Sequence, residues 1–298
     1  MASPIASSVL ALAIALRVVA TTPDVADMAR QIGGDRIEVT TIAAGTQDPH
    51  KVPVKPSFVT KLNRADALVV QGLGLEHAFL PALLEAARNP RIAPGAPAYI
   101  DSSLYVEALE IPSSTDRSQG ELHPLGNPHF NMDPVQGKRM ARAIAEGLER
   151  VDPEGATTYR DGLGRFTALL DAKIPLWLEL AAPLRGLKAV SYHQDLVYFA
   201  NRFGLVLDGT IETKPGVPAT ARHLEELIAR MKSDDVRLVI REVAYEMPLA
   251  ETVAEKSGGK VATVATLTGG LPGADTYAAF IEANLRAVLA AATPASSR

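Results

Sequence analysis

The sequence predicts an α/β fold of two lobes, each built on a four-stranded parallel sheet, joined by a long helix. Eight short runs rich in β-branched and apolar residues predict strands, and helix-period segments separate most of them. Strands that alternate with helices are typical of parallel sheets with helices on both faces. The longest stretch without a strand pattern, residues 133–185, divides the strands into two sets of four.

The expected strands of the first lobe are Arg17–Thr22, Arg36–Ile42, Ala65–Gly72 and Ala96–Asp101. Those of the second lobe are Leu187–His193, Leu205–Gly209, Val236–Glu242 and Lys260–Val264. Apolar residues at steps of three and four predict helices at Val25–Ile32, Pro56–Asn63, Ala219–Lys232 and Leu249–Lys256.

Two consecutive helices are expected between the two sets of strands. The first spans Gly137–Val151 and ends at Asp152-Pro153, and the second follows from residue 153 to about 184. Pro175 is expected to kink this second helix without ending it. A helix of roughly 25–30 residues is ~40 Å long, so it would restrain the relative motion of the lobes.

The predicted domain organisation has five parts. They are a signal-peptide-like or disordered segment at 1–16, an N-terminal α/β lobe at 17–152, a linking helix at 153–185, a C-terminal α/β lobe at 186–292 and a disordered tail at 293–298. The apolar run Ile5–Leu16 is shorter than the about 20 residues that span a bilayer. Small-x-small sequences such as Ala11-Leu12-Ala13 fit a signal-peptide cleavage site, although no Lys or Arg precedes the run. We therefore expect an exported, soluble protein.

Composition excludes several functional classes. The chain has 298 residues, with 30 Lys and Arg against 34 Asp and Glu, and this balance argues against nucleic acid or an anionic membrane as the main partner. The absence of cysteine excludes disulfides, thiolate zinc sites, iron–sulfur clusters and cysteine nucleophiles. The phosphate-loop and GxSxG motifs are absent, and His77 stands where a dinucleotide fingerprint beginning at Gly72 needs its third glycine. A transition metal would need imidazole and carboxylate ligands, and the chain has six histidines.

Three histidines occupy equivalent places in the predicted topology. His50 follows the second strand, His193 ends the fifth, and His129 lies in the loop before the first of the two central helices. Ligands of open α/β sheets bind beyond the carboxyl ends of the strands, so histidines from both lobes can converge only in the crevice between them. Asp275, after the eighth strand, is a candidate fourth ligand; its local alternative is to cap the helix Thr276–Leu289.

Seven short motifs, which include the candidate ligands, follow one another along the chain. They are Val18–Asp24, Ile32–Asp35, Asp48–His50, Gly72–Glu76, Asn127–Pro134, His193 with Tyr198-Phe199, and Asp275–Tyr277. In this order the sequence resembles the metal-binding solute-binding proteins of zinc and manganese ABC transporters, the zinc-transporter and adhesin-lipoprotein family. The resemblance extends from Arg17 to about Ala291. It implies two (β/α)4 lobes, a long backbone helix, one metal in the inter-lobe cleft, and a periplasmic carrier without catalytic turnover.

The same resemblance implies the ligands His50, His129, His193 and Asp275. Manganese members tend to have a carboxylate at the third position, where this chain has His193. Three imidazoles and one carboxylate suit tetrahedral Zn²⁺, whereas Mn²⁺ prefers more oxygen ligands. We therefore expect Zn²⁺ as cargo, with Mn²⁺ as the second choice. The expected partners are the ABC permease of a zinc importer and other periplasmic metallochaperones, with the chain itself a monomer.

Many zinc-binding members have a long His-rich acidic loop, but the corresponding segment here offers only Glu121 and His123. His123 is either a transient capture residue or a solvated loop residue. His77 is expected at the rim of the cleft and His223 on a surface helix without a role. The segment 212–218 also resembles the family and is expected near the cleft, with no role assigned to its residues.

Two alternatives use the same residues. One is a zinc-dependent enzyme in which the three histidines surround an open metal position and Asp275 is the general base. The other is a stand-alone metallochaperone, or an adhesin-type surface protein, that works without a permease.

Overall fold

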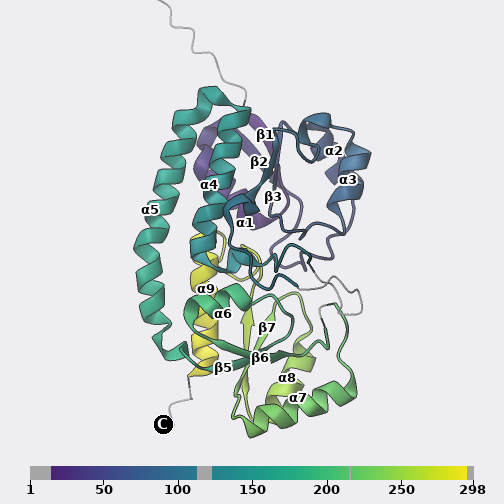
Figure 1. Ribbon diagram of the computed structural model, residues 1–298, viewed down its shortest axis with the longest axis vertical. Coiled ribbons are helices and arrows are strands. Elements are labelled where there is room, and N and C mark those ends of the chain that lie inside the picture. Colours follow the sequence, from purple (N-terminus) through teal and green to yellow (C-terminus); the bar gives the residue numbers. More distant parts are fainter. Residues whose placement is uncertain (1–14, 113–122, 215, 294–298) are drawn as a thin grey trace, which may run out of the picture.

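The computed structural model describes residues 15–112, 123–214 and 216–293, and it has the two predicted parallel sheets. The first has the strand order β2-β1-β3-β4 and the second β6-β5-β7-β8 (Figure 1). Each pair of neighbouring strands is parallel. The strands are β1 (Leu16–Ala20), β2 (Ile37–Thr41), β3 (Ala67–Val70), β4 (Tyr99–Asp101), β5 (Lys188–Ser191), β6 (Val206–Thr210), β7 (Leu238–Glu242) and β8 (Lys260–Val264). The predicted fold class is therefore confirmed.

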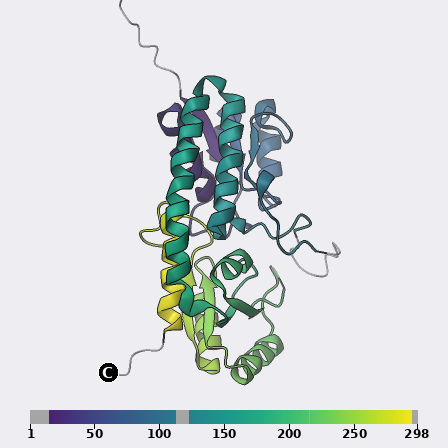
Figure 2. The same ribbon diagram turned by 60° about the vertical axis from the view of Figure 1, so that its left-hand side comes forward.

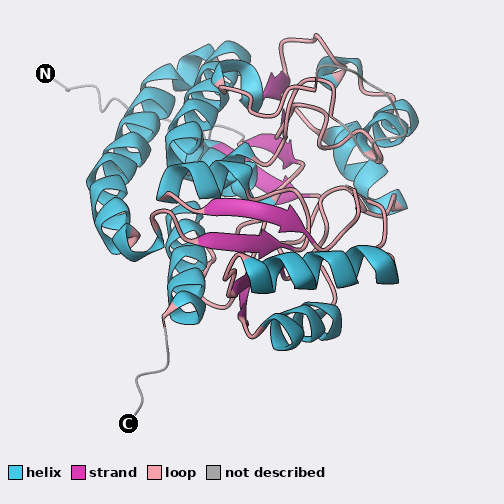
Figure 3. Cartoon of the chain, turned by 60° about the horizontal axis from the view of Figure 1, so that its bottom comes forward, coloured by secondary structure: helices cyan, strands magenta, loops and turns pink. Residues whose placement is uncertain are grey.

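Helices flank both sheets (Figure 3). They are α1 (Pro23–Gly33), α2 (Pro56–Arg64), α3 (Leu80–Ala87), α4 (Pro134–Val151), α5 (Ala156–Leu180), α6 (Val197–Phe203), α7 (Ala221–Ser233), α8 (Met247–Ser257) and α9 (Tyr277–Ala292). The sequence analysis did not name α3 and α6, two helices of 8 and 7 residues. No helix among the described residues is long and apolar enough to cross a membrane.

Several strands are shorter than predicted because their ends belong to turns. β3 begins at Ala67, since the N–H of Ala65 bonds to Leu62 at the end of α2. β4 begins at Tyr99, whose N–H closes a turn onto Ala96. β5 ends at Ser191, which leaves His193 in the loop beyond the strand rather than at its last position.

The long helix α5 runs along both lobes (Figures 1 and 2). It packs on α1 and α4 in the first lobe and on α9 in the second. Pro175 lies inside it without ending it, as predicted. Gly162 permits the contact with α1, because a Cβ at this position would lie only 2.2 Å from the carbonyl oxygen of Ile32.

Polar contacts also join the lobes near the start of α4. The carboxylate of Asp133, which caps α4, receives two hydrogen bonds from Arg202 of α6, at 2.7 and 2.8 Å. Asn131 donates to the carbonyl of Thr266, 2.7 Å away in the loop after β8. These contacts keep the carboxyl ends of both sheets facing the space between the lobes.

The ends of the chain and one loop lie largely outside the described residues. Residues 1–14 of the predicted signal-peptide-like segment are outside them, as are Glu121 and residues 294–298 of the predicted tail.

Candidate metal centre

Each of the three predicted histidines is held by its own loop. In the loop after β2, the N–H of His50 donates to Oδ1 of Asp48 at 2.9 Å. The N–H of His129 donates to Oδ1 of Asn127 at 3.0 Å, just before a 3₁₀ turn that leads into α4. His193 lies two residues beyond β5, and its carbonyl accepts a hydrogen bond from Oγ of Ser191 at 2.7 Å.

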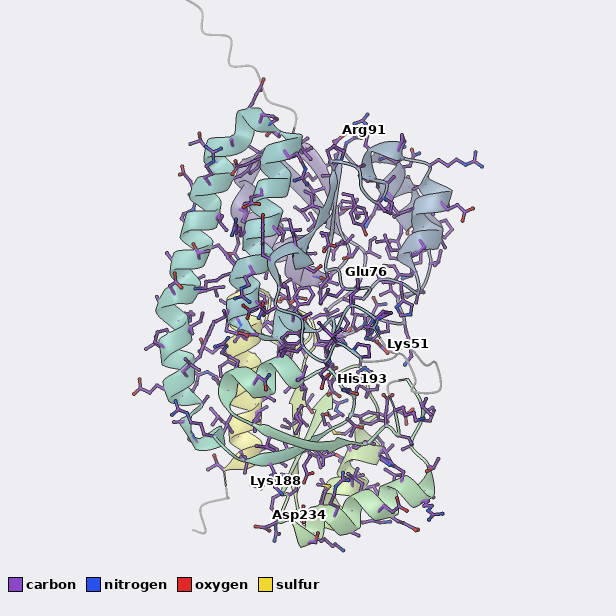
Figure 4. The ribbon with its side chains drawn as sticks, viewed as in Figure 1. Lys51, Glu76, Arg91, Lys188, His193 and Asp234 are labelled. Atoms are coloured by element: carbon purple, nitrogen blue, oxygen red, sulfur yellow. The ribbon has the colours of Figure 1, made fainter. Side chains whose placement is uncertain are left out.

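The structure brings these three side chains together. One ligand atom from each of His50, His129 and His193 lies within 4.8 Å of the other two. The Nε2 atoms of His50 and His129 are 3.0 Å apart. Two nitrogens on one tetrahedral Zn²⁺ lie about 3.3 Å apart when the Zn–N bonds are about 2.0–2.1 Å long. The spacing therefore fits a single metal ion, and Figure 4 shows His193 at the level where the two lobes meet.

The cluster is buried, and burial controls its charge. His50, His129 and His193 are 5%, 3% and 4% exposed. Burial, followed by the charge of His123, lowers the pKa of His50 to about 3. Burial, followed by the charge of His50, lowers the pKa of His129 well below its usual value. Both imidazoles are therefore neutral at pH 7, the form that binds a metal.

His193 differs from the other two. Burial opposes its protonation, but a hydrogen bond to Glu212 and the charge of Asp195 raise its pKa above the usual value. Its Nδ1 lies 2.6 Å from Oε2 of Glu212, which leaves Nε2 as its nitrogen for a metal. The family resemblance predicts that the segment of Glu212 lies near the cleft, and it assigns this residue no role. The sequence could have indicated this contact, because Glu212 follows β6 and β6 pairs with β5, the strand before His193.

The structure does not bring Asp275, the fourth predicted ligand, to the three histidines. Asp275 is exposed and does not belong to the group of histidines. Thr276, not Asp275, caps α9, and the N–H of Tyr277 donates to Asp27 of α1 at 2.8 Å. These contacts fix the end of the loop against the first lobe with Ala274 buried and Asp275 facing outward. The three histidines therefore come together in this structure without Asp275.

The remaining three histidines lie at the border of the cluster or away from it. The rings of His77 and His123 lie 6.5 and 5.0 Å from that of His50, so both border the cluster. His77 is exposed, as expected of a rim residue, and burial lowers the pKa of the partly buried His123 to about 4. His223 lies on α7, and its Nε2 contacts the carbonyl of Thr210 at 2.9 Å, away from the cluster.

A buried carboxyl pair behind His193 was not predicted. Asp195 and Glu242 are 1% and 0% exposed. Burial, followed by the charge of Asp195, raises the pKa of Glu242 well above its usual value. Burial raises the pKa of Asp195 as well. At most one of the two carboxyls is therefore expected to be charged.

Two α/β lobes with a buried imidazole cluster between them define a class of protein that holds a metal ion between its lobes. The chain belongs to the family described as "Zinc-uptake complex component A periplasmic" (ZnuA), whose model matches residues 18–291. This membership confirms the family resemblance seen in the sequence, and the members are solute-binding proteins of ABC transporters rather than enzymes.

Individual relatives extend this result. The chain is 25% identical over 285 residues to the iron ABC transporter substrate-binding lipoprotein MtsA of Streptococcus pyogenes serotype M1, covering 91% of this chain and 86% of that protein. It is 31% identical over 153 residues to the high-affinity zinc uptake system protein ZnuA of Brucella abortus (strain 2308), covering 50% of this chain and 45% of that protein. A crystal structure of ZnuA superposes with a TM-score of 0.79 at 26% identity, covering 94% of this chain and 100% of that chain.

Proposed function

We propose that this protein captures Zn²⁺ in the cleft between its lobes and delivers it to an ABC importer. The observation that carries the proposal is the buried cluster of His50, His129 and His193, with donor atoms within 4.8 Å of one another. Membership in the zinc-uptake family supports the same function.

The donor set favours zinc over the other metals that relatives carry. A donor group of three imidazole nitrogens suits Zn²⁺, whereas Mn²⁺ is favoured by carboxylate and other oxygen ligands. MtsA is named for iron, and Mn²⁺ is bound by a periplasmic metal-binding protein from Candidatus Liberibacter asiaticus that shares the fold at 18% identity. Both ions therefore belong in the test.

The proposed role is capture and release rather than catalysis. Three histidines with an open fourth position also occur in catalytic zinc sites. The enzyme alternative, however, needs a general base within hydrogen-bond reach of the metal-bound water. Its candidate base, Asp275, is exposed and outside the cluster. Of the carboxyl groups near the histidines, Glu212 is engaged with His193 and Asp48 with Lys51, and Asp195 and Glu242 form a buried pair.

The proposed location is the periplasm and the proposed partners are the importer's permease and, as a source of metal, other periplasmic metallochaperones. The protein would act as a monomer. Adjacent permease and ATPase genes would support the importer over a stand-alone metallochaperone or adhesin-type protein.

The decisive experiment is the metal preference of the purified full-length chain. Metal-free protein is titrated with Zn²⁺, Mn²⁺ and Fe²⁺ in competition with a chelator, and protein isolated from cells is analysed for its elements. We expect one Zn²⁺ per chain, bound more tightly than the other two ions. Preferential binding of Mn²⁺ or Fe²⁺ would refute the zinc assignment, and no metal binding would refute the function.

A further inference from the structure

Glu212 is a buried carboxylate beside His193 that the proposed ligand set does not use. It is 7% exposed, and its Oε2 lies 2.6 Å from Nδ1 of His193. An ionised carboxylate can only accept hydrogen bonds, so the hydrogen between them belongs to Nδ1 of His193. In the neutral imidazole the free lone pair then resides on Nε2.

Glu212 is itself held in place by the backbone around it. Its N–H donates to the carbonyl of Tyr192 at 3.0 Å, and its carbonyl accepts a hydrogen bond from Oγ1 of Thr210 at 2.8 Å. Its Oε2 also accepts the N–H of Gly216 at 3.2 Å, in a turn closed by the pairing of Lys214 with Val217. The carboxylate is therefore fixed before it meets His193.

A ring contact completes the support of His193. Its imidazole stacks on Tyr245, with ring centroids 5.6 Å apart and an interplanar angle of 26°. Tyr245 in turn stacks on Tyr192 at 4.7 Å and 17°. A hydrogen bond to the ring edge and a stacking contact on the ring face together fix both the place and the rotation of the imidazole. His50 lacks this support at its ring edge, because its buried Nδ1 has no hydrogen-bond partner among the described residues.

We propose that Glu212 is a positioning residue that keeps His193 in its Nδ1–H tautomer and directs Nε2 toward the donor atoms of His50 and His129. The inference rests on the proposed function, and it identifies Glu212 as a residue that determines the metal affinity of the site. A carboxylate behind a ligating histidine also makes the imidazole a stronger donor, and loss of such a partner typically weakens metal binding about 10–100-fold. Glu212 acts through His193 and does not itself bind the metal.

The first test compares Glu212→Ala and Glu212→Gln in the full-length chain, with Glu225→Gln as the control. Glu225 is an exposed residue of α7. Chelator competition with Zn²⁺ is expected to show affinity about 10–100-fold weaker for Glu212→Ala. Glu212→Gln should lose less, because its amide oxygen still accepts the Nδ1 hydrogen without the negative charge. Glu225→Gln should bind as the wild type does.

The second test reads the tautomer of His193 directly. Long-range ¹H–¹⁵N spectra of the metal-free chains, recorded at an alkaline pH at which His193 is neutral, should show the Nδ1–H form in the wild type and in Glu212→Gln, and a mixture of tautomers in Glu212→Ala. If Glu212→Ala does not fold, the loss of affinity in the folded Glu212→Gln variant decides the question.

The proposal is overturned if Glu212→Ala keeps wild-type zinc affinity, or loses affinity while His193 stays in the Nδ1–H form. A wild-type chain that binds no zinc would instead refute the proposed function. The tautomer comparison needs no metal, so it would still decide whether Glu212 positions His193.

Discussion

Asp24 and Thr268, which are 244 positions apart in the chain, are joined by hydrogen bonds at the interface of the two lobes. Oδ1 of Asp24 accepts a hydrogen bond from the hydroxyl of Thr268 at 2.9 Å. The backbone nitrogen of Thr268 lies 3.3 Å from each of the two carboxylate oxygens of Asp24. Asn131 donates to the same carboxylate at 3.3 Å. A fully buried carboxylate at the start of α1 thus anchors the loop that follows β8.

This anchor accounts for the position of Asp275. The loop between β8 and α9 is fixed at Thr268 by Asp24 and at Tyr277 by Asp27. Between these two points it also packs on Gly45, where a Cβ would lie 2.4 Å from the carbonyl oxygen of Thr268. The loop is therefore shaped by the first lobe, and it directs Asp275 to solvent rather than to the histidines.

The first prediction concerns the pH dependence of stability. Burial raises the pKa of Asp24 from 3.8 to about 6. Between these values the folded state holds a proton that the unfolded state has released, so stability from this group is full below pH 4 and falls as the pH rises through 6. The shift corresponds to roughly 3 kcal/mol. Asp24→Asn removes this dependence.

Urea unfolding of both chains at pH 4 and pH 7 measures the effect. The wild type should lose roughly 2 kcal/mol relative to Asp24→Asn between these two pH values, because part of the total effect is already lost at pH 4. Asp35→Asn, at an exposed position on the same lobe, controls for the loss of one negative charge. A constant difference between wild type and Asp24→Asn across the range would contradict the prediction.

The second prediction concerns two glycines of α5 that differ only in their surroundings. Gly162 is buried against α1, and a Cβ there would lie 2.2 Å from the carbonyl oxygen and 2.6 Å from the Cα of Ile32. A Cβ on the exposed Gly164 would meet nothing within 4 Å. We expect Gly162→Ala to destabilise the fold by about 1–3 kcal/mol, because the helices must separate. Gly164→Ala should stabilise it by up to about 1 kcal/mol.

Denaturant unfolding of the two variants side by side provides the measurement. The matched pair separates helix propensity from packing, since both substitutions replace glycine by alanine in the same helix. Equal stability of the two variants would mean that α5 does not approach α1 as closely as described.

The sequence predicted the sheets because buried parallel strands consist of short apolar runs such as Ala67–Val70. It also predicted that His50, His129 and His193 would meet. The carboxyl ends of parallel strands share one edge of a sheet, and the three residues were expected at this edge. Both inferences need only the local pattern and the topology.

Other features could not be predicted, because they depend on contacts between distant segments of the chain. Asp275 follows a Gly-rich loop whose shape is set by Asp24 and Asp27, and no local pattern encodes those contacts. The role of Glu212 depends on β6 lying beside β5, which brings its carboxylate to His193. Asp195 and Glu242 likewise meet only after β5 and β7 have paired.

The last prediction compares the three clustered histidines with Asp275. Alanine at His50, His129 or His193 should weaken Zn²⁺ binding by at least about 100-fold, because zinc-site energies of about 10–16 kcal/mol are shared among about four ligands. Asp275→Ala should leave the affinity unchanged, since this side chain is exposed and outside the cluster. Chelator competition on the four variants, with thermal unfolding to confirm that each is folded, provides the measurement. A large loss in Asp275→Ala would keep this residue in the ligand set and would require the loop after β8 to move when the metal binds.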